Sequence, residues 1–414
     1  MIGRGADLKS DIGCFYSATT QLNNGIGGDL YTLPDPATGW PMCMSVPGLV
    51  IFQPLSLLSP FLAATIWAVF NLALLAVSVV LLCKFLDRLD HRWDIYQEAL
   101  PSAIIILLLL SVGSIQVGQY SVLFVACWIL YLYSVAGRRN YLAGILLAIP
   151  SAIKLYPAMM LAVPVFCRGN RRGLTKQVLS FVLGVLFLFV IVPRLVYGPR
   201  AWELNKSFFQ NIIFGGSAKL SQVQSLDTPA NQSLDTVMLR YLSHDPAFHS
   251  RFPNVPHLHL ERGQVLLVAH IVRVLMVLAS TGFALLWWRR HDKHSAYAVM
   301  AMFALWSATL YVALPEVKAR YAIYAFGSFL PLLAVAAQAK ARSDRRGHIL
   351  YSVLVLLCLI LVLQFIPVSL QAYGVGFLGA VILWIANLRN IAAGGRGGRA
   401  EGAAQAGQTG QTAW

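Results

Sequence analysis

Charged side chains are scarce in this sequence of 414 residues. Asp, Glu, Lys and Arg together make up 12% of the chain, whereas hydrophobic residues make up 57%. A soluble globular domain has roughly 25% charged residues, so the shortage excludes a water-soluble enzyme. Apolar stretches of about 18 residues or more recur along the chain, and each can cross the roughly 30 Å hydrocarbon core as a helix. The sequence therefore predicts an all-α polytopic membrane protein.

Acidic residues are scarcer than basic ones, with 17 Asp and Glu against 32 Lys and Arg and a formal net charge of +15. Such an excess can indicate a nucleic-acid-binding protein, but the cytoplasmic loops of membrane proteins also carry it. Placement favours the second interpretation, because 19 of the 32 basic residues lie in short loops after apolar runs. No nucleic acid is expected as a partner. The loops contain Lys84, Arg88, Arg92; Arg138, Arg139; Arg168, Arg171, Arg172, Lys176; Arg289, Arg290, Lys293; Lys340, Arg342, Arg345, Arg346; and Arg389, Arg396, Arg399.

Uninterrupted apolar runs predict about nine spanning helices. They lie near residues 61–86, 101–117, 120–136, 177–197, 264–288, 297–314, 323–339, 349–369 and 373–388. Residues 141–166 are also apolar, but they contain Pro150, Pro157 and Pro164, and proline in a helix interior kinks or breaks the helix. We expect a broken hairpin that returns to its own face. All six basic loops then share one side, which the positive-inside rule makes cytoplasmic.

Two longer stretches, residues 1–60 and 198–263, fall on the extracytoplasmic side and separate the bundle halves 61–197 and 264–390. The proline-punctuated run GWPMCMSVPGLVIFQPLSLLSP predicts short interfacial helices anchored by Trp40 and Phe52.

Residues 391–414 are rich in Gly, Ala and Gln, and we expect a disordered cytoplasmic tail. An extracytoplasmic start requires a preceding signal or span, and the polar first eleven residues offer none. We expect a first helix upstream of Met1; the alternative is translocation without one.

Cysteine is sparse, and no spacing of the six cysteines is typical of a metal site. Cys14 and Cys43 share the oxidising side and could form a disulfide. The other four, Cys83, Cys127, Cys167 and Cys358, lie in or beside predicted spans and are interpreted as small apolar residues. Because no nucleotide-binding loop or metal-ligand cluster is visible, the sequence predicts neither a metal nor a cofactor.

Ionisable groups at membrane depth are costly and therefore mark candidate functional sites. Lys154 lies in the broken hairpin, and His270 and Arg273 lie inside the 264–288 span. Each also has a structural alternative. Lys154 could extend its charged end to the membrane surface or form a structural pair, and His270 and Arg273 could form hydrogen bonds to neighbouring helices. A carboxylate on an exterior loop above a membrane-embedded cation would combine a general base with a phosphate binder.

Four segments carry a family resemblance. They are DIGCFYSATTQLNNGIGGDLY, SVPGLVIFQPLSLLSPFLAATIWAVFNLALL, GQYSVLFVACWILYLYSVAGRRNYLAGILLAIPSAIKLYPAMMLAVP and NQSLDTVMLRYL. In this order, over about residues 7–330, they resemble glycosyltransferase family 87, the polyprenyl-phosphate-mannose-dependent α-mannosyltransferases and relatives of the GT-C superfamily. Where the family commonly has Tyr-Pro-Pro, this chain has Ser45-Val46-Pro47-Gly48.

The resemblance implies a GT-C-like helical bundle and a set of site residues. It places the catalytic aspartate on Asp11, which Phe15 and Tyr16 follow, with Asp7 as the alternative. Phosphate or substrate contacts fall on Gln119, Lys154, Arg320 (alternative Lys318), Asn231, Gln232, Ser233 and Arg240.

The resemblance also implies an activity. A hexose, with mannose as the expected sugar, would pass from a polyprenyl-phosphate donor to a glycolipid or glycan acceptor with inversion. The reaction would take place on the extracytoplasmic face of a bacterial-type plasma membrane. The alternatives are a transporter or lipid flippase, which the broken helix would suit, and an inactive GT-C-like scaffold.

Overall fold

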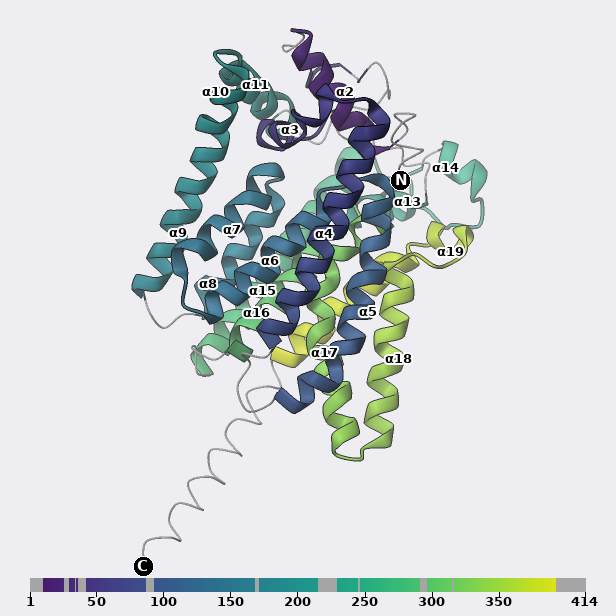
Figure 1. Ribbon diagram of the computed structural model, residues 1–414. Helices are drawn as coiled ribbons and strands as arrows, with labels where there is room; N and C mark the ends of the chain where they lie inside the picture. Colours follow the sequence, from purple (N-terminus) through teal and green to yellow (C-terminus); the bar gives the residue numbers. More distant parts are fainter. Residues whose placement is uncertain are drawn as a thin grey trace, which may run out of the picture.

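The computed structural model describes residues 10–25, 30–33, 35, 42–86, 93–167, 171–214, 229–244, 246–290, 296–314 and 316–391. Every regular element among these residues is a helix (Figure 1), which confirms the predicted all-α class. Asp7, Trp40 and the predicted tail beyond Ile391 lie outside the described residues.

Both halves of the chain contain long helices and short ones. The first half contains α2 (Asp11–Asn23), α3 (Val46–Phe52), η1 (Leu55–Leu57), α4 (Pro60–Leu86), α5 (Trp93–Val117), α6 (Ser121–Ala136), α7 (Asn140–Ile153), η2 (Tyr156–Leu161), α8 (Ala162–Cys167), α9 (Arg171–Leu186), η3 (Phe187–Ile191), α10 (Val192–Tyr197), α11 (Arg200–Phe208) and η4 (Phe209–Ile213). The second half contains α13 (Leu234–Leu242), α14 (Pro246–Arg251), α15 (Arg262–Arg290), α16 (Ala296–Ala313), η5 (Ala319–Ala325), α17 (Phe326–Ala341), α18 (Arg345–Val362), α19 (Val368–Ala372) and a last helix, Val375–Ile391.

Among the described residues, six helices, rather than the predicted nine or so, are long and apolar enough to cross a membrane: Pro60–Leu86, Glu98–Val117, Arg172–Tyr197, Arg262–Trp288, Ala319–Ala341 and Arg345–Val362. The predicted spans 120–136, 297–314 and 373–388 form shorter apolar helices. The run predicted to span 349–369 ends as a helix at Val362, because Gln364 has a φ of 58° and Pro367 follows. The sequence did not reveal this helix end because apolar residues continue through the turn after Val362.

The predicted break within 141–166 is confirmed. Helix α7 stops at Ile153, Lys154 is extended with φ −141° and ψ 135°, and η2 and α8 follow. Gly144 allows α7 to pack closely against α9, because a Cβ at this position would collide with the Ser180 hydroxyl.

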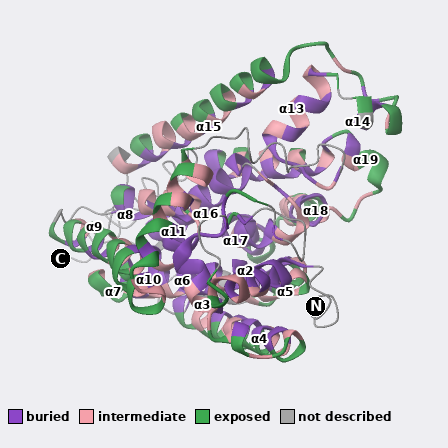
Figure 2. Ribbon diagram, turned by 90° about the horizontal axis from the view of Figure 1, so that it is seen from above, coloured by how far each residue is buried: buried purple, intermediate pink, exposed green. Residues whose placement is uncertain are grey.

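The outer faces of the long helices are apolar and exposed (Figure 2). Val69 on α4, Leu183 on α9 and Leu278 on α15 are all more than half exposed. Contiguous apolar surface on this scale is not stable in water, whereas a lipid bilayer matches it. The molecule is a membrane protein.

Short helices and the last turns of the Arg172–Tyr197 span lie at one end of the bundle. Figure 1 shows α2, α3, α10 and α11 gathered at that end and the α17–α18 turn at the other. Phe52, expected as an interfacial anchor, is instead fully buried, with its ring centroid 4.5 Å from that of Trp67 and 5.3 Å from that of Phe15. The expectation was wrong because α3 packs between α2 and the bundle. Cys14 is buried in α2 and Cys43 is exposed before α3, and no disulfide joins them.

Candidate active site

A buried carboxylate lies where four distant parts of the chain meet. Asp11, the first residue of α2, is 6% exposed. One of its oxygens pairs with the Arg320 guanidinium at 3.0 Å, and the other accepts a hydrogen bond from the Gln119 amide. Lys154 belongs to the same group, since its Nζ lies 5.0 Å from the ring centroid of Tyr321, the residue after Arg320. The structure thus brings Asp11, Gln119, Lys154 and Arg320 together.

The turn between α5 and α6 positions Asp11. Gly118 in this turn has a φ of +75°, and a Cβ there would lie 2.7 Å from the Ile12 Cβ. The indole N–H of Trp67 donates to the Gly118 carbonyl at 2.9 Å and fixes the turn. Glycine therefore permits both the left-handed backbone and the close approach of α2, which puts Gln119 beside Asp11.

Gln119 still has a polar atom without a partner. Its side-chain nitrogen donates to Asp11, and its Oε1 is buried without a hydrogen bond from any described residue. The assignment of nitrogen and oxygen follows from chemistry, because an ionised carboxylate only accepts hydrogen bonds. An acceptor is therefore available next to the carboxylate, where a hydroxyl group could donate.

Arg320 also bonds a second carboxylate. Its other terminal nitrogen lies 3.4 Å from the Glu316 Oε1, and the Tyr321 hydroxyl donates to the Glu316 Oε2 at 3.3 Å. Lys318 pairs with the same carboxylate. Burial raises the pKa of Glu316, but the charges of Lys318 and Arg320 outweigh burial and hold this pKa below its ordinary value.

Lys154 has no acidic partner within ion-pairing distance among the described residues. Its Nζ lies over two aromatic rings, 5.0 Å from the centroid of Tyr321 and 5.8 Å from that of Tyr156. Cation–π contacts stabilise a charge without neutralising it. The side chain is half-buried at the break after α7, so it is a cation that an anionic ligand could pair with.

Ser45 holds this break in place. Its hydroxyl accepts from the Gly48 N–H and so caps α3, and it donates to the Ala152 carbonyl at 2.6 Å. The Tyr120 hydroxyl donates to the Gly48 carbonyl at 2.6 Å. Helix α3 is therefore tied to the end of α7, two residues before Lys154.

Asn231, Gln232, Ser233 and Arg240 make their contacts with the protein itself. The Asn231 Oδ1 accepts from the Val317 N–H at 3.0 Å, and the Gln232 N–H donates to the Val317 carbonyl at 2.7 Å. Ser233 caps α13, and Arg240 donates to the Asn231 carbonyl at 2.8 Å. These contacts clamp Val317, which lies between Glu316 and Lys318.

Arg240 is enclosed in the interior. It is 2% exposed and donates a further hydrogen bond to the Gln371 carbonyl at 3.1 Å. Burial lowers the pKa of Arg240 to about 10, partly opposed by Tyr241, so the side chain remains charged at neutral pH. Arg240 therefore has a structural role, since it joins the Asn231 and Gln371 carbonyls in the interior.

The His270 and Arg273 pair is not part of this group. Arg273 forms an ion pair with Asp235 of α13 at 2.6 Å, and His270 is exposed on the outer face of α15. The contact of Arg273 with α13 matches the structural alternative considered from the sequence, whereas the exposed position of His270 does not.

Sequence reasoning missed a carboxylate and two tyrosines. Glu316 was overlooked, although an acid just after a predicted span on the exterior side was a usable signal. The Tyr156 hydroxyl donates to the Tyr324 hydroxyl at 2.8 Å, which also accepts from the Ser121 hydroxyl at 2.8 Å. No sequence spacing links these three residues, because they belong to different helices.

The model of glycosyltransferase family 87 matches residues 45–312, which is more than half of the chain. The match includes Gln119, Lys154 and the residues from Asn231 to Arg240, whereas Asp11 and Arg320 lie outside it. Comparisons with curated proteins and with solved structures returned no match.

Proposed function

The chain belongs to glycosyltransferase family 87 and is a membrane hexosyltransferase, and we propose that it transfers mannose from a polyprenyl-phosphate donor. The acceptor would be a glycolipid or glycan on the extracytoplasmic face of a bacterial-type plasma membrane. One observation carries the proposal: a buried carboxylate, Asp11, lies beside Arg320 in a group that also contains Lys154, a cation without an acidic partner among the described residues.

Asp11 is the proposed general base. The acceptor hydroxyl would attack the anomeric carbon, a new carbon–oxygen bond would form, and the bond to the phosphate oxygen would break. Asp11 would take the hydroxyl proton as the attack proceeds, and the Gln119 Oε1 would accept a hydrogen bond from the sugar acceptor. Attack from the face opposite the leaving group inverts the anomeric carbon.

Lys154 and Arg320 are the proposed phosphate binders. The leaving polyprenyl phosphate gains negative charge as its bond to the sugar breaks, so fixed cations stabilise the transition state more than the ground state. Arg320 Nε is buried without an acceptor among the described residues, and a phosphate oxygen would satisfy it. No step in this scheme requires a metal.

The remaining residues predicted from the sequence stabilise the segment that carries the site. Asn231 and Gln232 clamp Val317, and this clamp sets the position of the segment that carries Glu316 and Arg320. Ser233 caps α13 and Arg240 bonds the Asn231 carbonyl, so both support the clamp. We assign them a positioning role rather than direct contact with the donor. The apolar outer faces of the long helices would leave the polyprenyl chain in the bilayer while its phosphate enters the site.

A transfer assay tests this function. Purified protein in proteoliposomes would receive radiolabelled polyprenyl-phosphate mannose and a glycolipid extract, with the glucose and galactose donors as parallel samples. Label on the acceptor from the mannose donor supports the proposal. Label from another donor alone contradicts the sugar, movement of the donor across the bilayer without transfer indicates a flippase, and the absence of both indicates an inactive scaffold.

A further inference from the structure

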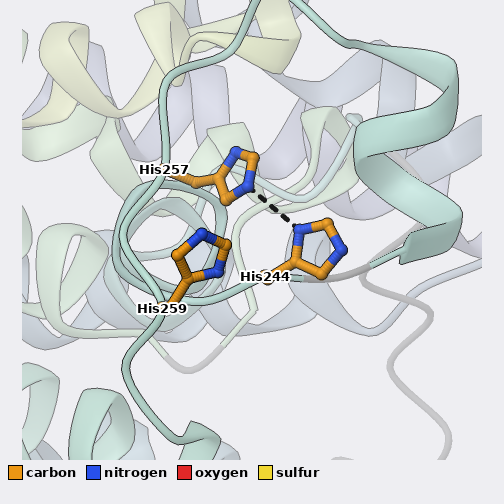
Figure 3. A group of neighbouring side chains, drawn as sticks. All are labelled: His244, His257 and His259. Carbon is orange, nitrogen blue, oxygen red and sulfur yellow. Dashed lines mark hydrogen bonds between the residues drawn. The ribbon is translucent and has the colours of Figure 1, made fainter.

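Three histidines meet on the segment between α13 and α15, away from the groups used above. His244 follows the end of α13, and His257 and His259 precede α15 (Figure 3). One ring nitrogen of each histidine lies within 4.8 Å of the others. In the part of the chain that the structure describes, this is the one cluster of three side chains with metal-ligand spacing.

The backbone fixes two of the three ligands. The Leu258 N–H donates to the Tyr241 carbonyl at 2.8 Å, and the Leu260 N–H donates to the Leu242 carbonyl at 2.9 Å. These bonds hold residues 257–260 extended against the last turn of α13. Side chains two residues apart in an extended segment point to the same side, so His257 and His259 both face His244.

The ring geometry suits a divalent metal. His244 Nδ1 and His257 Nε2 are 3.0 Å apart, and the ring centroids of His257 and His259 are 5.3 Å apart. A tetrahedral zinc with nitrogen ligands at 2.0–2.1 Å separates those nitrogens by about 3.3 Å, so small ring rotations would admit the ion. His244 and His259 are exposed and His257 is half-buried, which leaves the ion accessible from solution.

The surroundings already orient one ligand. The His257 Nδ1 lies 3.4 Å from the Val255 carbonyl, so an N–H at that position makes Nε2 the unprotonated nitrogen, which is the one that can ligate a metal. The His249 ring packs against His257 with centroids 3.9 Å apart and ring planes tilted by 40°, and its own Nε2 lies 3.1 Å from the Arg240 carbonyl. A buried, hydrogen-bonded ring thus supports the ligand ring from behind, as outer-shell groups do in metal sites.

We propose that His244, His257 and His259 bind one Zn²⁺ or a similar imidazole-preferring divalent ion, with water at the fourth position. Binding would displace the proton shared by His244 and His257, and the ion would replace that hydrogen bond. The site would lock residues 255–260 to the end of α13. The other end of α13 carries the clamp on Val317, so the ion would stiffen the segment that supports the proposed active site.

The three ligands do not form a recognisable sequence motif, because twelve residues separate His244 from His257 and only the His-Leu-His triplet is local.

The proposal does not depend on the transferase assignment. Its test uses full-length protein purified without a histidine tag, stripped with a chelator and titrated with ZnCl₂ alone. His270→Ala, which changes an exposed histidine on α15, is the matched control for His259→Ala.

Wild type and His270→Ala are expected to bind one zinc per chain by elemental analysis after desalting, and zinc should raise the unfolding temperature by at least about 3 °C. His259→Ala should lose 100-fold or more in affinity while remaining monodisperse. Cobalt in place of zinc should give the visible absorption of a tetrahedral complex in wild type and His270→Ala but not in His259→Ala. Equal zinc binding by His259→Ala and His270→Ala, or no retained zinc in wild type, overturns the proposal.

Discussion

At the residue scale, Lys154 is the sharpest test of donor recognition. Its positive charge contacts two tyrosine rings and has no carboxylate partner among the described residues. A hydrogen bond to a charged group contributes roughly 1.5–3 kcal/mol, so Lys154→Met should weaken binding of polyprenyl-phosphate mannose about 10- to 150-fold. Lys176→Met is the control, because Lys176 of α9 likewise lies over a tyrosine ring, that of Tyr141 of α7. Equal donor affinity in a folded Lys154→Met variant would return Lys154 to a structural role.

Arg320 differs from Lys154 because it already has anionic partners. Its guanidinium joins Asp11 and Glu316, so Arg320→Gln should misplace the carboxylate as well as weaken phosphate binding. We expect both a higher KM for the donor and a lower kcat, whereas Arg273→Gln, which breaks the ion pair with Asp235, should change stability alone. Kinetics of the two purified variants separate these outcomes. An unchanged kcat in Arg320→Gln would contradict the coupling to Asp11.

At the element scale, Gly118 sets the distance between α2 and the α5–α6 turn. Gly118→Ala would force a Cβ to 2.7 Å from the Ile12 Cβ at a φ of +75°, a strain on the order of 1–3 kcal/mol. The variant should unfold at a lower temperature and transfer sugar at least tenfold more slowly, because α2 carries Asp11. Gly282→Ala, where nothing lies within 4 Å, should be neutral. Equal losses in both variants would contradict this placement of α2.

The clamp on Val317 is a second test at this scale. Asn231→Ala removes the acceptor of the Val317 and Ser233 N–H groups, and leaving a buried donor unpaired costs about 1–3 kcal/mol. We expect a lower unfolding temperature and a lower kcat with little change in donor affinity. Asn254→Ala at an exposed position is the control. A large loss of donor affinity with unchanged stability would instead make Asn231 a ligand of the donor.

Elements differ in how far the sequence predicts them. The long apolar runs and the break at Lys154 follow directly from composition and proline placement. The end of α18 does not, because apolar residues continue past Val362. Helices α6 and α16 lie where apolar runs were predicted, at 120–136 and 297–314, but they are among the shorter apolar helices. The burial of Phe52 was hidden as well, since an aromatic residue in a proline-rich run has the same local pattern at a membrane interface and in a core.

The site shows the same division. The resemblance placed Asp11, Gln119, Lys154 and Arg320, and the structure brings these four together. Glu316 and the Tyr156–Tyr324 contact depend on how helices pack, which no local spacing encodes. Arg240 shows the converse, because its motif suggested a phosphate ligand and its contacts are those of an internal brace.

At the scale of the whole molecule, the site requires that its end of the bundle face outward. The excess of basic residues in the opposite loops predicts this orientation. In a background with Cys43→Ser and Cys83→Ala, a cysteine at Asn254 should react with an impermeant thiol reagent added outside intact cells, and one at Arg342 should not. Both positions are exposed. Labelling at Arg342 alone would place the site on the cytoplasmic side and contradict the proposed lipid-linked donor.

The central claim is that Asp11 removes the acceptor proton, and the transfer rate of Asp11→Asn tests it most directly. Asparagine keeps the size of the side chain and loses its basicity, so turnover with polyprenyl-phosphate mannose should fall about 10²- to 10⁴-fold while donor binding stays near wild type. Asp235→Asn, which alters a carboxylate paired with Arg273, should retain turnover. Wild-type turnover by a folded Asp11→Asn protein would contradict the account, and loss of turnover in Asp7→Asn instead would move the base to Asp7.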